Sequence, residues 1–154
     1  MKKLIKNLFF SKSNSGSSEE KLGDVRDGYM LLKKGDDGTN TYAYIEDLAL
    51  EDDRYVAFSR LYRFPKAERW ISSVNHEFDQ MIVFIELDCI RSASNPGNLN
   101  PIRTRVTKTQ YFTESKLIHQ DNVDDIKLWQ DVKDLKEDSY ERLEADFICS
   151  KIKP

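Results

Sequence analysis

Runs of hydrophobic residues separated by polar turns occupy the middle of the chain, and residues 103–111 begin with charged side chains two positions apart, as in a β-strand with one solvated face. Such runs, several of them rich in aromatic and β-branched residues, predict strands over residues 29–32, 41–45, 55–62, 81–89, 103–111 and 117–119. Gly35 and Gly38 flank two aspartates between the first two runs. Because glycine and aspartate adopt the positive φ values of tight turns, these two runs are expected to pair as a hairpin. The most apolar run, 81–89, is expected at the centre of the sheet.

The last third of the chain changes to a helical period. Residues 139–150 carry large apolar side chains three and four positions apart, namely Tyr140, Leu143 and Phe147. Asp138 and Glu141 fit a capping box in front of them, so the sequence predicts a helix over this range. A shorter helical turn is expected over residues 126–135, and a loop over residues 92–101. Strands followed by a helix predict an α+β fold, an antiparallel sheet of about five to six strands with a C-terminal helix packed on one face.

Two parts of the chain are distinguished by composition. Residues 1–22 combine a basic amphipathic segment with a serine-rich linker, and residues 23–150 are expected to form a single α+β domain. Lys6 interrupts the apolar side chains of the first ten residues, so neither a working signal peptide nor a transmembrane helix is predicted. The segment is expected to form a short helix docked on its own domain or on a partner, with a weak membrane-surface anchor as the alternative.

Composition excludes several classes of function. The chain has 154 residues, 39% of them hydrophobic and 33% charged, and a net charge of −3. This is typical of one soluble globular domain, without stable membrane insertion, and it lacks the basic excess that nucleic-acid binding normally needs. His76 and Glu77 begin a near match to the zinc-protease motif, but Gln80 replaces its second histidine. With no glycine-rich phosphate loop either, we expect no enzymatic activity, no metal and no cofactor.

The small net charge hides a strong segregation of charge along the chain. Residues 121–141 hold eight acidic side chains against three lysines, and a second acidic cluster spans residues 46–53. Both segments also contain apolar residues, as a surface that binds a basic protein would. The predicted partner-binding residues are six acids, with Trp129 as the apolar anchor: Glu51, Asp52, Asp53, Asp124, Asp125 and Asp131. The alternative is an ordinary solvated face.

A set of short segments resembles a known family. They are Tyr-Val-Ala-Phe-Ser at 55–59, Ile-Val-Phe-Ile-Glu-Leu-Asp-Cys at 82–89, residues 105–111, Trp-Gln-Asp-Val at 129–132, and residues 139–149. Together they resemble the surface-adhesin protein E-like domains over about residues 42–149. The resemblance implies a curved antiparallel sheet with a C-terminal helix tied to it through Cys89 and Cys149. It also implies export to the cell surface and non-catalytic binding of host matrix or plasma proteins.

Two functions follow as hypotheses. In the first, the chain is a cytoplasmic immunity-type protein that neutralises an interbacterial toxin through its acidic face, and Cys89 and Cys149 form a reduced apolar contact. In the second, it is an exported adhesin-like domain, in the periplasm or at the cell surface, with the two cysteines bridged. Its acidic host ligands would then meet basic strand residues: Arg60, Arg63, Arg103 and Arg105.

Overall fold

The fold is an antiparallel sheet with one α-helix on it. The computed structural model describes residues 20–52, 54–65, 69–71, 76–91, 93–94, 97–122 and 129–152. In this part of the chain there are a nine-stranded sheet, a two-stranded sheet, one short 3₁₀-helix and one α-helix. The α+β class and the C-terminal helix are therefore confirmed. No helix within these ranges is long and apolar enough to span a membrane.

The strands differ widely in length. Those of the large sheet are β1 (Val25–Arg26), β2 (Tyr29–Lys34), β3 (Asn40–Tyr44), β4 (Leu50–Glu51), β5 (Tyr55–Arg63), β8 (Gln80–Arg91), β9 (Leu99–Thr113), β10 (Lys116–Asn122) and β11 (Gln130–Asp131). The small sheet pairs β6 (Arg69–Ile71) with β7 (His76–Phe78). After β11 come the 3₁₀-helix η2 (Val132–Asp134) and the α-helix α2 (Tyr140–Lys151).

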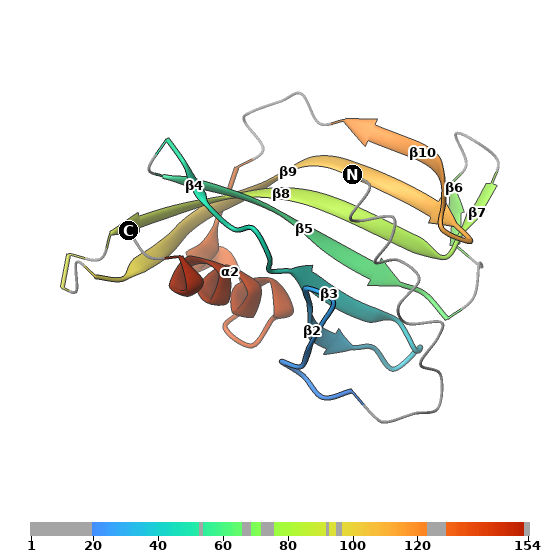
Figure 1. Ribbon diagram of the computed structural model, residues 1–154, viewed down its shortest axis with the longest axis horizontal. Coiled ribbons are helices and arrows are strands. Elements are labelled where there is room, and N and C mark those ends of the chain that lie inside the picture. Colours follow the sequence, from blue (N-terminus) through green and yellow to red (C-terminus); the bar gives the residue numbers. More distant parts are fainter. Residues whose placement is uncertain are drawn as a thin grey trace.

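The large sheet has the order β1-β2-β3-β5-β8-β9-β10, and every pairing in it is antiparallel (Figure 1). The predicted β2–β3 hairpin and the central position of β8 are confirmed. Two short strands extend the sheet at one end, where β4 pairs with β5 and β11 pairs with β9. The expected number of five to six strands is too low, because two-residue strands such as these show no detectable alternation.

Two local expectations were wrong. The predicted loop 92–101 is shorter, because β9 already begins at Leu99, which is buried and pairs with Arg91. The helical turn expected over 126–135 is, in its described part, a strand followed by a 3₁₀-helix. Only Val132 of η2 is buried there.

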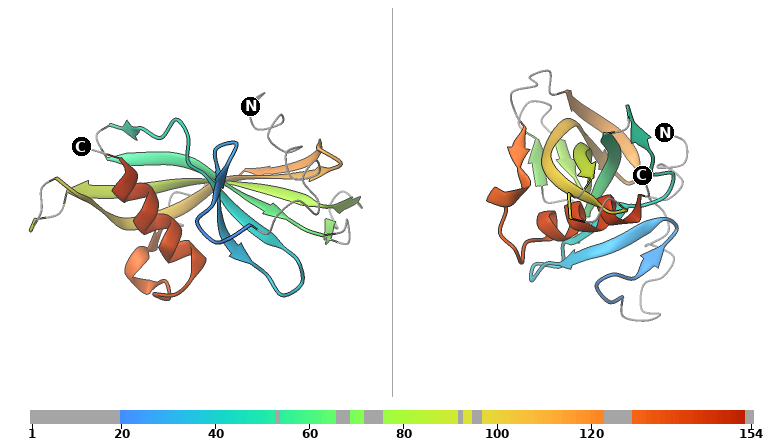
Figure 2. Two further views of the ribbon diagram at one scale, coloured as in Figure 1. Left: turned by 60° about the horizontal axis from the view of Figure 1, so that its bottom comes forward. Right: turned by 90° about the vertical axis from the view of Figure 1, so that its left-hand side faces the viewer.

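Alternation along the strands gives the sheet two different faces, each with its own apolar cluster. We call the face that contacts α2 the helix face and the other the opposite face; Figure 2 shows α2 against one side of the sheet. The helix-face cluster includes Phe58, Ile85 and Leu87. The opposite-face cluster consists of Tyr29, Leu31, Tyr42, Leu61, Ile82 and Phe112.

Helix α2 is rotated relative to the apolar stripe that its sequence suggests. Its buried apolar side chains are Ala145, Ile148 and Cys149, whereas Leu143 is 51% exposed. The rotation brings Cys149 to Cys89 on β8, with which it forms a disulfide at a Cα–Cα distance of 5.7 Å. The sequence left open whether Cys89 and Cys149 are reduced or bridged, and in the structure they are bridged.

The first turn of α2 is capped one residue later than predicted. The N-cap is Ser139, whose Oγ accepts a hydrogen bond of 3.2 Å from the backbone N–H of Arg142. Asp138, the expected cap, lies outside the helix. Serine and aspartate are equally good N-caps, so residue type alone could not decide between Asp138 and Ser139.

The tyrosines of the sheet make stability sensitive to alkaline pH. Burial, and then the nearby Tyr44, raises the pKa of Tyr29 above its ordinary value, and burial is also the first cause of the raised pKa of Tyr42. A group with a raised folded-state pKa stabilises the protein below its unfolded pKa, about 10 for tyrosine, and this contribution is lost as the pH rises. Tyr29 alone should lower the free energy of unfolding by about 1.4 kcal/mol per pH unit above about pH 10.

This prediction is checked by urea unfolding between about pH 8 and about pH 11. The Tyr29→Phe variant is the control, and its stability should decline less steeply with pH because it lacks the titrating phenol. Equal slopes for the two proteins would contradict the assignment to Tyr29.

Candidate functional site

One row of paired residues crosses the sheet on the opposite face. Backbone register places five residues side by side on β4, β5, β8, β9 and β11: Glu51, Tyr55, Asp88, Arg103 and Asp131. Residues paired across antiparallel strands share a face, so their side chains form one line. These residues come from positions up to eighty apart in the sequence. The row is therefore a product of the tertiary fold.

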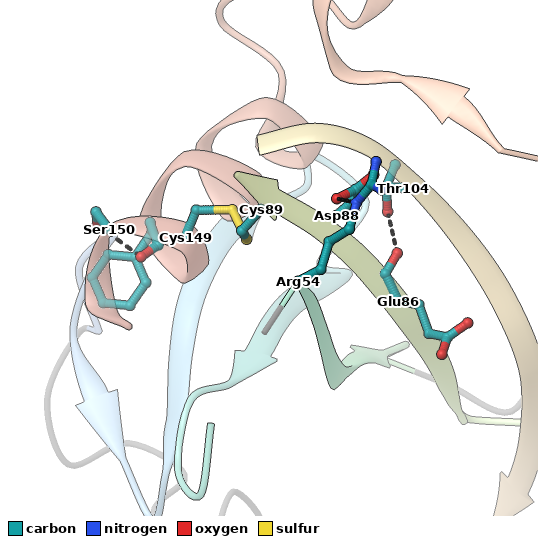
Figure 3. The surroundings of a disulfide bond; sticks show 8 residues. Arg54, Glu86, Asp88, Cys89, Thr104, Cys149 and Ser150 are labelled. Carbon is teal, nitrogen blue, oxygen red and sulfur yellow. Dashed lines mark hydrogen bonds and ion pairs between the residues drawn. A yellow bond between two sulfur atoms is a disulfide. The ribbon is translucent and has the colours of Figure 1, made fainter. Parts of the chain in front are cut away.

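Asp88 is the centre of this row and is completely buried. Its carboxylate accepts hydrogen bonds from Nε and Nη2 of Arg54 at 2.7 and 2.8 Å, and from Nε of Arg103 at 3.0 Å. The hydrogen bonds to Asp88, followed by its charge, raise the pKa of Arg54. Figure 3 shows that Asp88 and the next residue, Cys89, point to opposite sides of β8. The same strand thus holds the helix on one face and the arginines on the other.

Trp129, directly before β11, packs on this arrangement. The guanidinium groups of Arg103 and Arg105 lie 4.5 and 4.6 Å from its ring centroid. The ring of Tyr55 lies 5.8 Å away at an interplanar angle of 30°. Contacts at these distances are cation–π and aromatic interactions. We call Arg54, Tyr55, Arg103, Arg105 and Trp129 the arginine–tryptophan cluster.

Carboxylates hold the guanidinium groups of the cluster in place. Glu86 accepts two hydrogen bonds from Arg105, from Nε at 2.8 Å and from Nη2 at 2.5 Å, and Asp88 holds the other two arginines. The side chain of Arg54 is nevertheless 48% exposed, and that of Arg103 is 32% exposed. A set of arginine and aromatic side chains that is both fixed and accessible loses little conformational entropy on binding.

The cluster is bordered by exposed carboxylates. Glu51, Asp52 and Asp131 are all exposed, and Asp52 occupies the turn between β4 and β5 with φ at 53°. Protein–protein interfaces commonly have aromatic and arginine residues at the centre and a polar rim. The geometry of this face matches that arrangement.

The structure brings together part of the predicted partner-binding set. Glu51, Asp131 and Trp129 meet at the same end of the sheet, and Asp52 follows Glu51 directly. The other three predicted residues, Asp53, Asp124 and Asp125, lie outside the described residues. Trp129 itself packs against arginines, so its immediate surroundings are cationic and the acids lie around them.

Sequence reasoning missed Arg54, Tyr55 and Asp88. The one signal for them was Asp88, a carboxylate within the most apolar run of the chain. A charged side chain in a central strand is tolerated only when it is paired, so a carboxylate at this position indicates a basic partner nearby. The strand order decides which arginines reach Asp88, and this order cannot be read from the sequence alone.

Arg60, one of the basic residues considered for acidic ligands, has a structural role instead. It faces α2 and forms an ion pair with Glu144, and the two side chains are only 11% and 2% exposed. Burial by itself would lower the pKa of Arg60, but the charge and hydrogen bonds of Glu144 raise it above its ordinary value. Arg60 also donates a 3.0 Å hydrogen bond to the hydroxyl of Tyr62. Arg63, at the end of β5, is half-buried.

Within the described ranges, no group of three histidine, cysteine, aspartate or glutamate side chains is arranged to hold a metal ion. The two histidines lie apart, on β7 and β10. His119 contacts the carboxylate of Asp121 at 2.7 Å on the surface of β10.

Comparison with known proteins gave no relative: no protein-family model, no curated protein and no solved structure matches this chain. The resemblance to the surface-adhesin domains stays a prediction.

Proposed function

We propose that this chain is a non-enzymatic protein-binding module and that the arginine–tryptophan cluster is the centre of its binding surface. The observation that carries the proposal is the packing of Trp129 against Arg103, Arg105 and Tyr55 on an accessible face. Tryptophan, tyrosine and arginine are the residues on which binding energy concentrates in protein interfaces. Their fixed geometry limits the entropy lost on association.

The charge balance of this face favours a basic partner. The three arginines of the cluster, Arg54, Arg103 and Arg105, are paired with only two carboxylates of the same chain, those of Asp88 and Glu86, which leaves one positive charge. Glu51, Asp52 and Asp131 are exposed and have no ion-pair partner within the described part of the chain. Carboxylates at a rim accelerate association with a basic protein and disfavour acidic ones. A surface of this kind suits toxin neutralisation better than it suits binding of acidic host ligands through arginines.

The disulfide favours the exported location over the cytoplasmic one. Disulfides persist in the periplasm, at the cell surface and outside the cell, and are rare in the cytosol. The Cys89–Cys149 bond joins two buried residues, one on the central strand and one on the helix. We therefore place the protein, and the basic protein that it binds, in the periplasm or at the cell surface.

The proposal is tested with the partner isolated by cross-linking and affinity purification from the native host. Trp129→Ala should weaken the complex at least about 30-fold, the loss that a truncated hot-spot residue causes. Glu51→Gln combined with Asp131→Asn should lower the association rate and its salt dependence. Surface plasmon resonance measures both effects.

The matched control is Glu137→Gln, which removes an exposed carboxylate before α2 and should leave binding unchanged. Unchanged affinity of the Trp129→Ala variant, with its fold verified by circular dichroism, would contradict the proposed surface.

A further inference from the structure

A hollow of about 540 Å³ lies on the opposite face, beside the arginine–tryptophan cluster. Ala57 and Ser59 of β5 line it together with Phe84 and Glu86 of β8. Other residues that line the hollow come from the end of β3, from the segment after it and from β9: Tyr44, Glu46, Asp47, Thr107 and Lys108. Glu86 belongs to both features, because its Oε1 holds Arg105 of the cluster.

The hollow exists because small side chains stand where the rest of the face carries large ones. Ala57 pairs with Glu86, and Ser59 pairs with Phe84 in the next row. Although β5 is an interior strand of the sheet, Ala57 is exposed. In the neighbouring row Tyr55 occupies the corresponding position on β5. A volume of this size lies within the range of sites that enclose a ligand group.

The lining of the hollow suits a long cationic side chain. Both hydrogen bonds from Arg105 end on Oε1 of Glu86, so within the described residues Oε2 has no hydrogen-bond partner. Glu46 and Asp47 add two exposed carboxylates to the lining, and Oε2 of Glu46 also accepts a 3.3 Å hydrogen bond from the hydroxyl of Tyr44. The ring of Phe84 already interacts with one cation, the Nζ of Lys108 at 4.2 Å from the ring centroid. Carboxylates and an aromatic ring together are the groups that bind guanidinium.

We propose that the hollow receives the side chain of one arginine from the basic partner. The inference rests on the proposed function, because it assumes a basic partner and specifies which of its side chains contacts this face. The guanidinium would bind between Glu86 and the Glu46–Asp47 pair, and its methylene stem would cover Ala57 and Phe84. A charge-assisted hydrogen bond in this partly enclosed position would add specificity for arginine over neutral side chains.

The test is a titration of the ¹⁵N-labelled full chain with N-acetyl-L-arginine methylamide, followed by amide chemical shifts. Saturable shifts are expected at Ala57, Ser59 and Phe84, with a dissociation constant on the order of 1 mM, as for a single small group. The citrulline analogue has nearly the same shape without the charge and should bind at least about tenfold more weakly. Ala57→Trp fills the hollow and should abolish the shifts.

A tryptophan placed elsewhere is the matched control. Leu117→Trp, at an exposed position on β10, should leave binding unchanged. The inference is overturned if no saturable shift occurs, if citrulline binds equally well, or if the Ala57→Trp variant still binds.

The two proposals fail separately. If Trp129→Ala abolishes partner binding but arginine does not enter the hollow, the proposed function stands without this inference. If arginine enters the hollow but Trp129→Ala leaves partner binding intact, the cluster is not the centre of the interface.

Discussion

Replacing Glu144 with leucine is expected to lower the free energy of unfolding by about 3–5 kcal/mol, because it leaves the guanidinium of Arg60 buried without a counter-charge. Arg60 donates to both carboxylate oxygens of Glu144, through Nε at 3.1 and 2.9 Å and through Nη2. The pair connects β5 to α2, and Arg60 also donates to the hydroxyl of Tyr62, which lies 2.7 Å from the hydroxyl of Tyr140. Chemical unfolding monitored by circular dichroism measures the loss.

A double-mutant cycle separates the ion pair from simple packing. The Arg60→Met/Glu144→Leu variant removes both charges and should be more stable than either single variant, since a buried pair is often replaceable by apolar residues of similar volume. If the loss of unfolding free energy in the double variant equalled the sum of the losses in the two single variants, the pair would not act as a unit.

The stability of the Arg60→Met variant is expected to fall as the pH rises. Burial raises the pKa of Glu144, an effect that Arg60 opposes in the native protein. Without Arg60, the folded state should favour the protonated carboxyl. A raised folded-state pKa gives stability that is present at low pH and lost as the pH rises, so this variant should unfold more readily at about pH 8 than at about pH 5.

Replacing Cys89 and Cys149 together with alanine is expected to lower the free energy of unfolding by about 4 kcal/mol. The bond closes a loop of 60 residues, and the chain-entropy model ties its stabilising effect to that length. For a chain of this size the loss corresponds to a fall of about 8–16 °C in the melting temperature. Without the bond, α2 is still held by Ala145, Ile148 and the Arg60–Glu144 pair.

Reductant provides the internal control for this prediction. Dithiothreitol should lower the melting temperature of the native protein toward that of the double variant and leave the variant itself unchanged. Coincident melting curves of the oxidised native protein and the double variant would show that the disulfide contributes nothing to stability.

Both predictions concern the helix face, whereas the proposed binding surface lies on the opposite face. The two are joined through β8, in which Cys89 contacts α2 and Asp88 holds Arg54 and Arg103. Because neighbouring residues of a strand point to opposite sides, one strand positions both the structural bond and the binding cluster.

Local pattern in the sequence determined much of the fold. The aromatic and β-branched residues of β5, the continuous apolar run of β8, the glycine-flanked turn between β2 and β3, and the helical spacing after Ser139 are short-range signals, and each led to the right element. They succeed because strand and helix periods arise from the geometry of a few consecutive residues. The charge segregation likewise drew attention to Glu51, Trp129 and Asp131.

Only the tertiary structure decided which of these residues meet. Alternation shows that Tyr55 and Ala57 share a face, but it contains no information on which strand lies beside them or in which register. The line from Glu51 through Asp88 to Asp131 depends on four strand pairings, two of them made by two-residue strands. The rotation of α2 was hidden for the same reason, because long-range contacts at Glu144 and Cys149 override the apolar stripe of the helix itself. Neighbouring positions in the chain determine secondary structure, whereas packing between distant segments determines the site.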